Sequence, residues 1–354
     1  METVVRKLFD NRMLQIILSH ADTDGITSAL NLTWYAEILG CSVITCIERN
    51  PSDKMTTQML NEVLASIDIN EYRYVEVMIS DRAFISEVAN LPDHVHFSWF
   101  DHHEGSVLPM EEIHRLTNGN VRDIILKTDI NHCGATITYE AIMDRLIDHY
   151  QPMYSKALEV WNKNVNLWDT FLWKKIYGDN PEMVTLGKKM GCIDKMYDDP
   201  AELFRVLYCY LVAGIGLNSD IVNNWVDNLY AEYNEMADAA YEEAVSKATK
   251  FGDDCVFIPI GRKFGSIVKE RYSEEHPEAK IILTYTGRGA SIYTVSDYSI
   301  PAYEIAKFIG SKYGLNGGGH PNAAGCSVIS PEEDTNDELV YERLLVGLKE
   351  FFNK

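Results

Sequence analysis

MLQIILSHADTDGITSALNLTWYAEILG, residues 13–40, combines an apolar run, a polar turn and a helical pattern. The run 13–20 predicts a buried strand, and 27–40 predicts a helix that packs against it. Further apolar runs follow at 42–48, 74–81, 96–103 and 122–129, and a second helical pattern lies at 54–67. Strands that alternate with helices indicate βαβ units. We therefore expect an α/β domain with a mainly parallel sheet flanked by helices.

The remainder of the chain changes character twice. Helical patterns dominate from about 134 to 250, beginning with 134–150 and ending with a long one at 218–249. Apolar runs that predict strands then return at 254–261, 279–287, 290–297 and 324–330. A length of 354 residues also favours two domains. We predict a first domain at 1–215, a helical connector at 216–251 and a smaller α/β domain at 252–354.

Charge and composition exclude several classes of protein. The net charge is −21, with 53 acidic and 32 basic residues, which disfavours binding of long duplex nucleic acid and favours a small or short anionic substrate. No apolar run approaches the roughly 20 residues of a membrane span, and the N-terminus does not resemble a signal peptide. The seven cysteines are scattered, and the closest pair, Cys41 and Cys46, is expected to be two buried thiols. We therefore expect a cytoplasmic protein without a membrane partner.

Acidic and histidine residues follow three of the predicted strands. His20-Ala-Asp22-Thr-Asp24-Gly25 follows the first strand, Asp81 ends another, and Asp101-His102-His103 ends a third. A single aspartate at a strand end is usually a turn residue or a helix cap. Three such groups at the carboxyl edge of one parallel sheet indicate a ligand site instead. Carboxylates mixed with imidazoles suit Mn²⁺ or Mg²⁺ better than zinc.

These residues resemble the motifs of the DHH/DHHA1 phosphoesterase superfamily, and most closely its nanoRNase and oligoribonuclease B-like members. The resemblance spans nearly the whole chain, because a downstream stretch, LNGGGHPNAAG, matches the glycine-rich signature of the DHHA1 domain. The matching positions are His20, Asp22, Asp24, Asp81, Asp101, His102, His103, Gly317, Gly318, Gly319 and His320.

The resemblance implies a site for two divalent metal ions, with Mn²⁺ favoured and Mg²⁺ or Co²⁺ as alternatives. His20 and Asp22 would hold the first ion, and Asp24 and His102 the second. Asp81 would bridge the two. A later aspartate completes the second site in this family. Asp169 is the preferred candidate, with Asp129 and Asp179 as alternatives.

Two further residues of the signature are implied to act beside the metals. Asp101 would lie near the first ion or orient a ligand, and His103 would contact the phosphate or a ligand. A protonated His103 could stabilise a phosphate oxygen or deliver a proton to the leaving group. Asp81, Asp101 and His103 are therefore the candidate catalytic residues.

The second domain is expected to hold the substrate phosphate, with the active site in a cleft between the domains. Consecutive glycines at 317–319 let backbone N–H groups approach an oxyanion, and His320 follows them directly. Arg288, in a TGRG turn, could bind a terminal phosphate with two hydrogen bonds. Arg262 and Lys263 are weaker candidates of the same kind.

The leading functional hypothesis is hydrolysis of short RNA or DNA oligonucleotides to mononucleotides by a hydroxide that bridges the metals. Dephosphorylation of 3′-phosphoadenosine 5′-phosphate and cleavage of cyclic or linear dinucleotides are alternatives with the same metal chemistry. A non-catalytic nucleotide-binding relative is the alternative from a different class. The substrate, the direction of degradation, the metal and the oligomeric state, including a homodimer, stay open.

Overall fold

The computed structural model describes residues 3–7, 12–49, 52–85, 91–103, 108–129, 131–146, 156–212, 219–251, 254–261, 263–285, 289–295, 299–313, 315–319, 323–328 and 337–352. The chain divides into two compact units, Met1–Tyr230 and Ala231–Lys354. The division falls inside one long helix, α9 (Ser219–Ser246). The predicted boundaries at 215 and 251, and a site between the domains, stay predictions.

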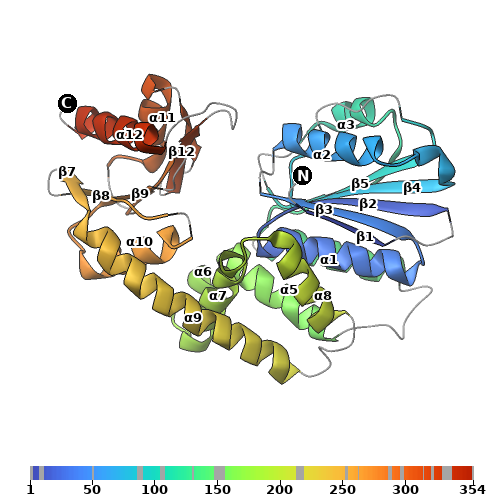
Figure 1. Ribbon diagram of the computed structural model, residues 1–354, viewed down its shortest axis with the longest axis horizontal. Helices are drawn as coiled ribbons and strands as arrows, with labels where there is room; N and C mark the ends of the chain where they lie inside the picture. Colours follow the sequence, from blue (N-terminus) through green and yellow to red (C-terminus); the bar gives the residue numbers. More distant parts are fainter. Residues whose placement is uncertain are drawn as a thin grey trace. The chain divides into compact units, whose positions relative to one another are not determined.

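The first unit is built on a six-stranded sheet with the order β1-β3-β2-β4-β5-β6 (Figure 1). Every neighbouring pair is parallel except β1 and β3, which are antiparallel. The expectation of a mainly parallel α/β sheet is therefore confirmed; the edge strand β1 was not predicted. The strands are β1 (Thr3–Lys7), β2 (Met13–His20), β3 (Ser42–Glu48), β4 (Tyr74–Ser80), β5 (Val95–Asp101) and β6 (Val121–Leu126).

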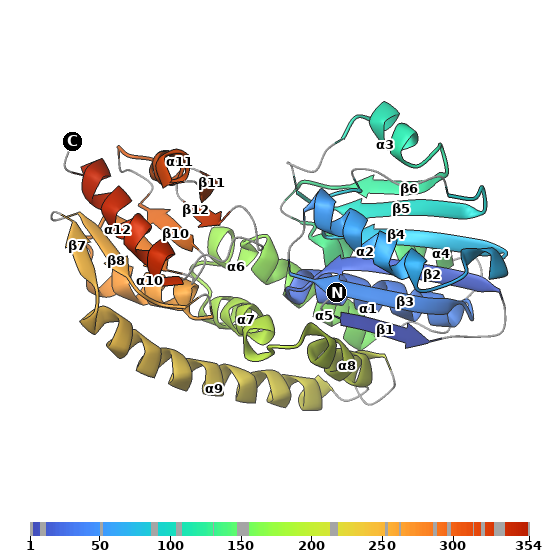
Figure 2. The ribbon, with the colours of Figure 1, turned by 45° about the horizontal axis from the view of Figure 1, so that its top comes forward.

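Helices cover both faces of this sheet, because its strands are apolar on both sides. Leu14, Ile16 and Leu18 of β2 pack in one core with α2 and α3, whereas Ile17 packs in a second core with α1, α4, α5 and α8. Figure 1 and Figure 2 show α2 and α1 on opposite sides of the sheet. The helices of the unit are α1 (Thr23–Ile38), α2 (Asp53–Ala65), α3 (Met110–Leu116), α4 (Gly134–Leu146), α5 (Lys156–Asp169), α6 (Leu172–Lys175), α7 (Pro181–Cys192) and α8 (Pro200–Leu211).

The register of the sheet brings the ends of three strands to one edge. Ser19 of β2 is paired with Ser80 of β4, and Ser80 is paired with Phe100 of β5. The next residue along each strand is therefore His20, Asp81 or Asp101. Parallel pairing alone places these three positions side by side at the carboxyl edge of the sheet.

The second unit contains a six-stranded mixed sheet with the order β11-β12-β10-β9-β8-β7. Only β8 and β9 are parallel. Helices α11 and α12 pack on one face, and α10 with the end of α9 packs on the other. The elements are β7 (Thr249–Phe251), β8 (Cys255–Ile258), α10 (Gly265–Glu275), β9 (Ile281–Tyr285), β10 (Gly289–Thr294), α11 (Ala302–Tyr313), β11 (Leu315–Gly319), β12 (Ala323–Val328) and α12 (Asp337–Phe352).

The glycines at 317–319 lie in β11, a strand that was not predicted from the sequence. Their strand pairs with β12, with Gly317 opposite Cys326. A Cβ atom at Gly317 would lie 2.0 Å from the carbonyl oxygen of Ala306, whereas a Cβ atom at Gly318 would meet nothing within 4 Å. Glycine at 317 therefore lets β11 lie directly against α11.

Two further expectations concern the described residues. None of their helices combines the length and the hydrophobicity that are needed to cross a membrane. Cys41 and Cys46 are both buried free thiols, as expected; Cys41 directly precedes β3, and Cys46 lies within that strand.

We expect Gly317→Ala to destabilise the protein by about 2 kcal/mol or more, because the new methyl group overlaps a backbone carbonyl that cannot move freely. Gly318→Ala is the matched control and should change the free energy of unfolding much less. Urea unfolding of both variants measures the difference. Equal stability of the two variants would contradict the packing described for β11 and α11.

Candidate metal centre

The turn from β2 into α1 positions the first three site residues. Asp22 is the N-cap of α1, and its Oδ1 accepts a hydrogen bond from the backbone N–H of Gly25 at 2.9 Å. A Cβ atom at Gly25 would lie 2.3 Å from the carbonyl oxygen of His20, so only glycine fits where the helix folds back onto the strand end. Asp22 therefore caps the first turn of α1.

His20 is held in one orientation by its backbone surroundings. Its Nε2 lies 2.9 Å from the carbonyl oxygen of Arg49. Since a carbonyl only accepts, Nε2 carries the hydrogen and Nδ1 has the free lone pair of the neutral ring. Nδ1 lies 2.9 Å from Oδ2 of Asp22 and 3.5 Å from Oδ2 of Asp81. This arrangement, with one ring nitrogen on a carbonyl and the other facing carboxylates, is typical of a metal-binding histidine.

Asp81 lies at the middle of the site with its two oxygens facing two different imidazoles. Oδ2 faces His20, and Oδ1 lies 3.3 Å from Nε2 of His102. The residue is buried and has a left-handed backbone, with φ of 52°. Aspartate tolerates this conformation better than most residues. The carboxylate is thus oriented as a bridge between two groups of ligands.

Asp24 connects the site to the start of α4. Its oxygens accept hydrogen bonds from the backbone N–H groups of Gly134 at 2.8 Å and Ala135 at 2.6 Å. Oδ2 also lies 3.5 Å from Nε2 of His102. A Cβ atom at Gly134 would be 2.9 Å from Cβ of Asp81, so the helix can approach this closely only with glycine there.

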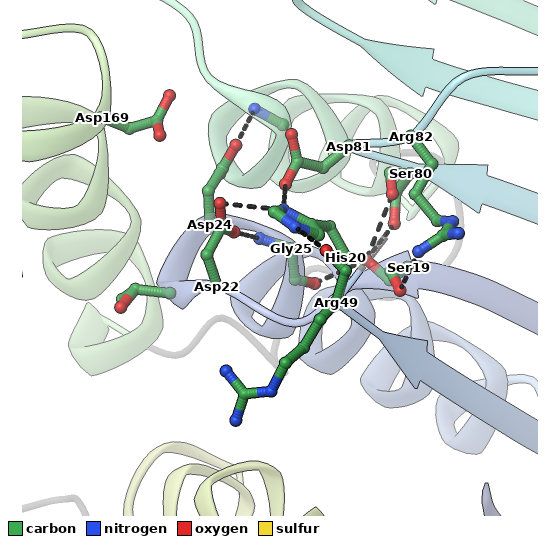
Figure 3. Close-up of polar contacts among 12 residues, drawn as sticks. Ser19, His20, Asp22, Asp24, Gly25, Arg49, Ser80, Asp81, Arg82 and Asp169 are labelled. Atoms are coloured by element: carbon green, nitrogen blue, oxygen red, sulfur yellow. Dashed lines mark hydrogen bonds and ion pairs between the residues drawn. The ribbon is translucent and has the colours of Figure 1, made fainter. Parts of the chain in front are cut away.

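Asp169, the last residue of α5, joins this group. Its Oδ2 lies 3.4 Å from Nε2 of His102, and Figure 3 shows it approaching from the side opposite the strands. The two alternative aspartates lie elsewhere: Asp129 is hydrogen-bonded to His132, and Asp179 is exposed. The structure therefore favours Asp169 over both alternatives.

Asp101 and His103 form a pair beside the cluster. Oδ1 of Asp101 accepts a hydrogen bond from the backbone N–H of His102 at 2.8 Å and lies 2.9 Å from Nδ1 of His103. Nδ1 of His103 is also 3.8 Å from Oδ1 of Asp81. The His103 side chain is 53% exposed, in contrast to the buried Asp101. Asp101 thus fixes the turn and orients an imidazole that solvent or a ligand can reach.

The carboxylates have strongly perturbed acidities. Burial raises the pKa of Asp24 well above its usual value, and repulsion from Asp81 and Asp169 adds to the rise. Burial likewise raises the pKa of Asp169 to about 7. Burial would also raise the pKa of Asp81, but the nearby imidazoles of His102 and His20 hold it far below its usual range. The positive charge nearby therefore does not balance the negative charge of the three carboxylates.

The imidazoles supply part of that charge. Burial would lower the pKa of His20, but Asp22 and Asp81 raise it to about 11. His102 shows the same balance, with a pKa raised to about 10 by its carboxylate neighbours against the effect of burial. Without a cation, both rings are therefore protonated at neutral pH, because the surrounding carboxylates need a counter-charge.

The donor set fits divalent metal ions. Three groups each place their ligand atoms within 4.8 Å of one another: His20, Asp22, Asp81; Asp24, His102, Asp169; and Asp81, Asp101, His102, His103. Buried oxygens of Asp81, Asp101 and Asp169 accept no hydrogen bond. Among the described residues, no lysine or arginine forms an ion pair with Asp24, Asp81 or Asp169. Unpaired buried carboxylate oxygens are costly unless a cation binds them.

Some predicted residues are not among those that the structure describes, and some residues of the site were not predicted. Arg288, His320 and Arg262 lie outside the described residues, so their roles stay predictions. The contributions of the Arg49 carbonyl and of Gly134 were missed. A carbonyl leaves no signal in a sequence, whereas the glycine that begins GATITYEA was visible but had no assigned partner.

Several solved structures share the fold of this chain. RecJ from Thermus thermophilus in complex with Mn²⁺ has a TM-score of 0.61 and 15% identity over 96% of this chain and 52% of its own. An exonuclease RecJ bound to manganese has a TM-score of 0.59 and 15% identity, over 96% of this chain and 90% of its own. A DHH domain described as a member of the S1p family of ribosomal proteins has a TM-score of 0.57 and 16% identity, over 96% of this chain and 87% of its own.

This chain thus spans about half the length of the Thermus RecJ structure. No family sequence model and no curated protein sequence matches it. At identities of 15–16% the likeness establishes the fold, and this confirms the fold that was expected from the sequence. The ligand roles of the individual residues stay predictions.

We expect Asp169→Asn to weaken Mn²⁺ binding by about tenfold or more, because the amide removes one negative ligand from the second group. Asp129→Asn, at one of the two alternative positions, is the matched control and should bind Mn²⁺ as the unmodified protein does. Isothermal titration calorimetry measures the affinities, and the Mn²⁺-induced rise in melting temperature should follow them. Equal Mn²⁺ affinity of the two variants would show that Asp169 is not a ligand.

Proposed function

We propose that this protein is a two-metal phosphodiesterase of the DHH/DHHA1 type that cleaves short oligonucleotides. The observation that carries the proposal is Asp81, whose two oxygens face the His20 group and the His102 group separately. A carboxylate between two sets of hard ligands is the arrangement that holds a pair of divalent ions at short separation.

His20 and Asp22 would hold one ion and Asp24, His102 and Asp169 the other, with Asp81 shared. When bound, two such cations offset the charge of a phosphodiester and lower the pKa of water, so that a nucleophile is present near neutral pH. Mn²⁺ is the proposed ion because the ligands mix carboxylates with imidazoles; Mg²⁺ and Co²⁺ are alternatives. The Thermus RecJ structures, described as complexes with Mn²⁺ and Mg²⁺, support such a choice.

His103 is the proposed proton donor to the leaving oxygen. Its ring lies beside Asp81 and is half exposed, so a substrate can reach it. The hydrogen bond from Nδ1 to Asp101 raises the pKa of the ring, which favours the protonated form. Because Nδ1 faces Asp101, Nε2 is the nitrogen that we propose donates the proton. Asp101 orients this imidazole in the same way that a carboxylate orients a catalytic histidine elsewhere.

The chain's charge supports a short substrate. A net charge of −21 repels a long polyanion, so contact should be confined to the metal centre and a local phosphate-binding group. Arg288, His320 and Gly317–Gly319 are the proposed contacts to the terminal phosphate in the second unit. The free state of all seven cysteines supports the cytoplasm as the proposed compartment. A homodimer is compatible with these proposals.

A panel of substrates tests the proposal directly. Di- to pentanucleotides of RNA and DNA, 3′-phosphoadenosine 5′-phosphate and cyclic dinucleotides are each incubated with Mn²⁺, Mg²⁺ or Co²⁺. Mononucleotide release from the oligonucleotides supports the proposed function, and preferential cleavage of another substrate would replace it with the corresponding alternative. No product from any substrate with any ion would leave the non-catalytic nucleotide-binding protein as the better description.

Asp81→Asn should reduce kcat at least 1000-fold, because the amide cannot bridge two cations and their spacing is lost. The variant is nearly isosteric, so its folding can be checked by circular dichroism. Asp129→Asn should retain the kcat of the unmodified protein. Near-normal turnover by Asp81→Asn on the preferred substrate would show that the site is assigned wrongly.

A further inference from the structure

A bulky aromatic residue lies at the corner between α5 and α6. Phe171 follows Asp169 by two residues, and its backbone is left-handed, with φ of 59°. Its N–H donates to the carbonyl oxygen of Trp168 at 3.0 Å, and its own carbonyl accepts from the N–H groups of Lys174 and Lys175 at 3.1 and 2.9 Å. The backbone at 171 is therefore fixed on both sides.

This conformation is unfavourable for phenylalanine. Where a helix ends in a left-handed residue, glycine is the usual choice because it has no Cβ atom to clash. The Phe171 ring gains little burial in return, since the residue is 51% exposed. Strained residues of this kind occur most often at functional sites, where another requirement maintains them.

The neighbouring aromatic rings form a firm base for Phe171. Trp168 and Trp173 are stacked with their ring centroids 5.7 Å apart and an interplanar angle of 13°, and the Trp168 and Phe171 centroids are 6.3 Å apart. Trp173 and Trp168 pack against two glycines of α7. A Cβ atom at Gly187 or Gly191 would lie 2.5 or 2.4 Å from them, respectively. The corner that presents Phe171 is therefore closely packed beneath an exposed ring.

Charge and position point to the kind of ligand. Asp169, two residues away, faces His102 in the metal centre. Nζ of Lys175 lies 5.8 Å from the centre of the Phe171 ring. An exposed ring with a cation beside it, two residues from a candidate ligand of the metal centre, has the composition of a nucleotide site.

We infer that Phe171 is a stacking surface for the base of a nucleotide whose phosphate is bound at the neighbouring metal centre. The inference rests on the proposed function and names the part of the substrate that this corner recognises. Ile176 and Tyr177, which follow on the same segment, are also exposed, by 60% and 39%. Stacking tolerates any base, so it suits an enzyme that degrades fragments of mixed sequence.

Adenosine 5′-monophosphate and ribose 5-phosphate form a matched pair of probes, because they differ by the base alone. Their affinities for the full chain are measured by calorimetry in the presence of Mn²⁺. The unmodified protein should bind the nucleotide at least about tenfold more tightly than the sugar phosphate. Phe171→Gly should bring the two affinities to within about twofold of each other, because it weakens binding of the nucleotide and leaves binding of the sugar phosphate unchanged. Phe171→Trp should keep the difference.

Thermal stability separates this role from a structural one. Phe171→Gly relieves the left-handed strain, so its melting temperature should equal or exceed that of the unmodified protein. Val160→Ala removes another exposed apolar side chain, one that is 46% exposed on α5, and should change neither affinity. A clearly lower melting temperature of Phe171→Gly, or an unchanged preference for the nucleotide, would overturn the inference.

The two hypotheses fail in different ways. If the protein cleaves oligonucleotides but Phe171→Gly keeps the full preference for the nucleotide, the function stands and the stacking surface is rejected. If no substrate is cleaved but the preference exists and depends on Phe171, the stacking surface stands and the catalytic function is rejected.

Discussion

The contact of Asp24 with the first turn of α4 connects the sheet, the helical layer and the metal centre. Burying a carboxyl group is costly unless hydrogen bonds replace those that it makes to water. Two backbone N–H groups, from Gly134 and Ala135, do so here, at the end of a helix where the dipole favours negative charge. Because a Cβ atom at 134 would lie 2.9 Å from Cβ of Asp81, the fit of α4 and the position of the Asp81 carboxylate depend on each other.

A second buried group, the Arg82 side chain, stabilises the carboxyl edge of the same sheet. Arg82 is fully buried directly after Asp81, and its guanidinium donates to the carbonyl oxygens of Glu48 at 3.0 Å and Ser19 at 3.3 Å. Its Nε donates to Oγ1 of Thr56 on α2 at 3.1 Å. One side chain thus connects the ends of β2 and β3 to a helix, and its residue directly follows Asp81 after the end of β4. The candidate metal ligands therefore lie next to a segment that is fixed by hydrogen bonds.

Predictability from the sequence follows the physical origin of each feature. The runs 13–20 and 42–48 match β2 and β3 residue for residue, because a strand buried on both faces is a continuous apolar run. The strand β11 was missed since LNGGG has no strand propensity and depends on packing against α11. Burial of Arg82 could not be foreseen because arginine is usually exposed. The strain at Phe171 follows from the helix corner, which only the structure reveals.

The hydrogen bond from His20 to the carbonyl of Arg49 has a consequence for protein design and for evolution. The peptide group that selects the ring nitrogen is present in every amino acid, so residue 49 can drift without altering that selection. A sequence alignment would therefore give no sign of its importance. Transplanting only the segment from His20 to Asp24 into another sheet would leave the imidazole free to rotate. The end of the adjacent strand must be transferred with it.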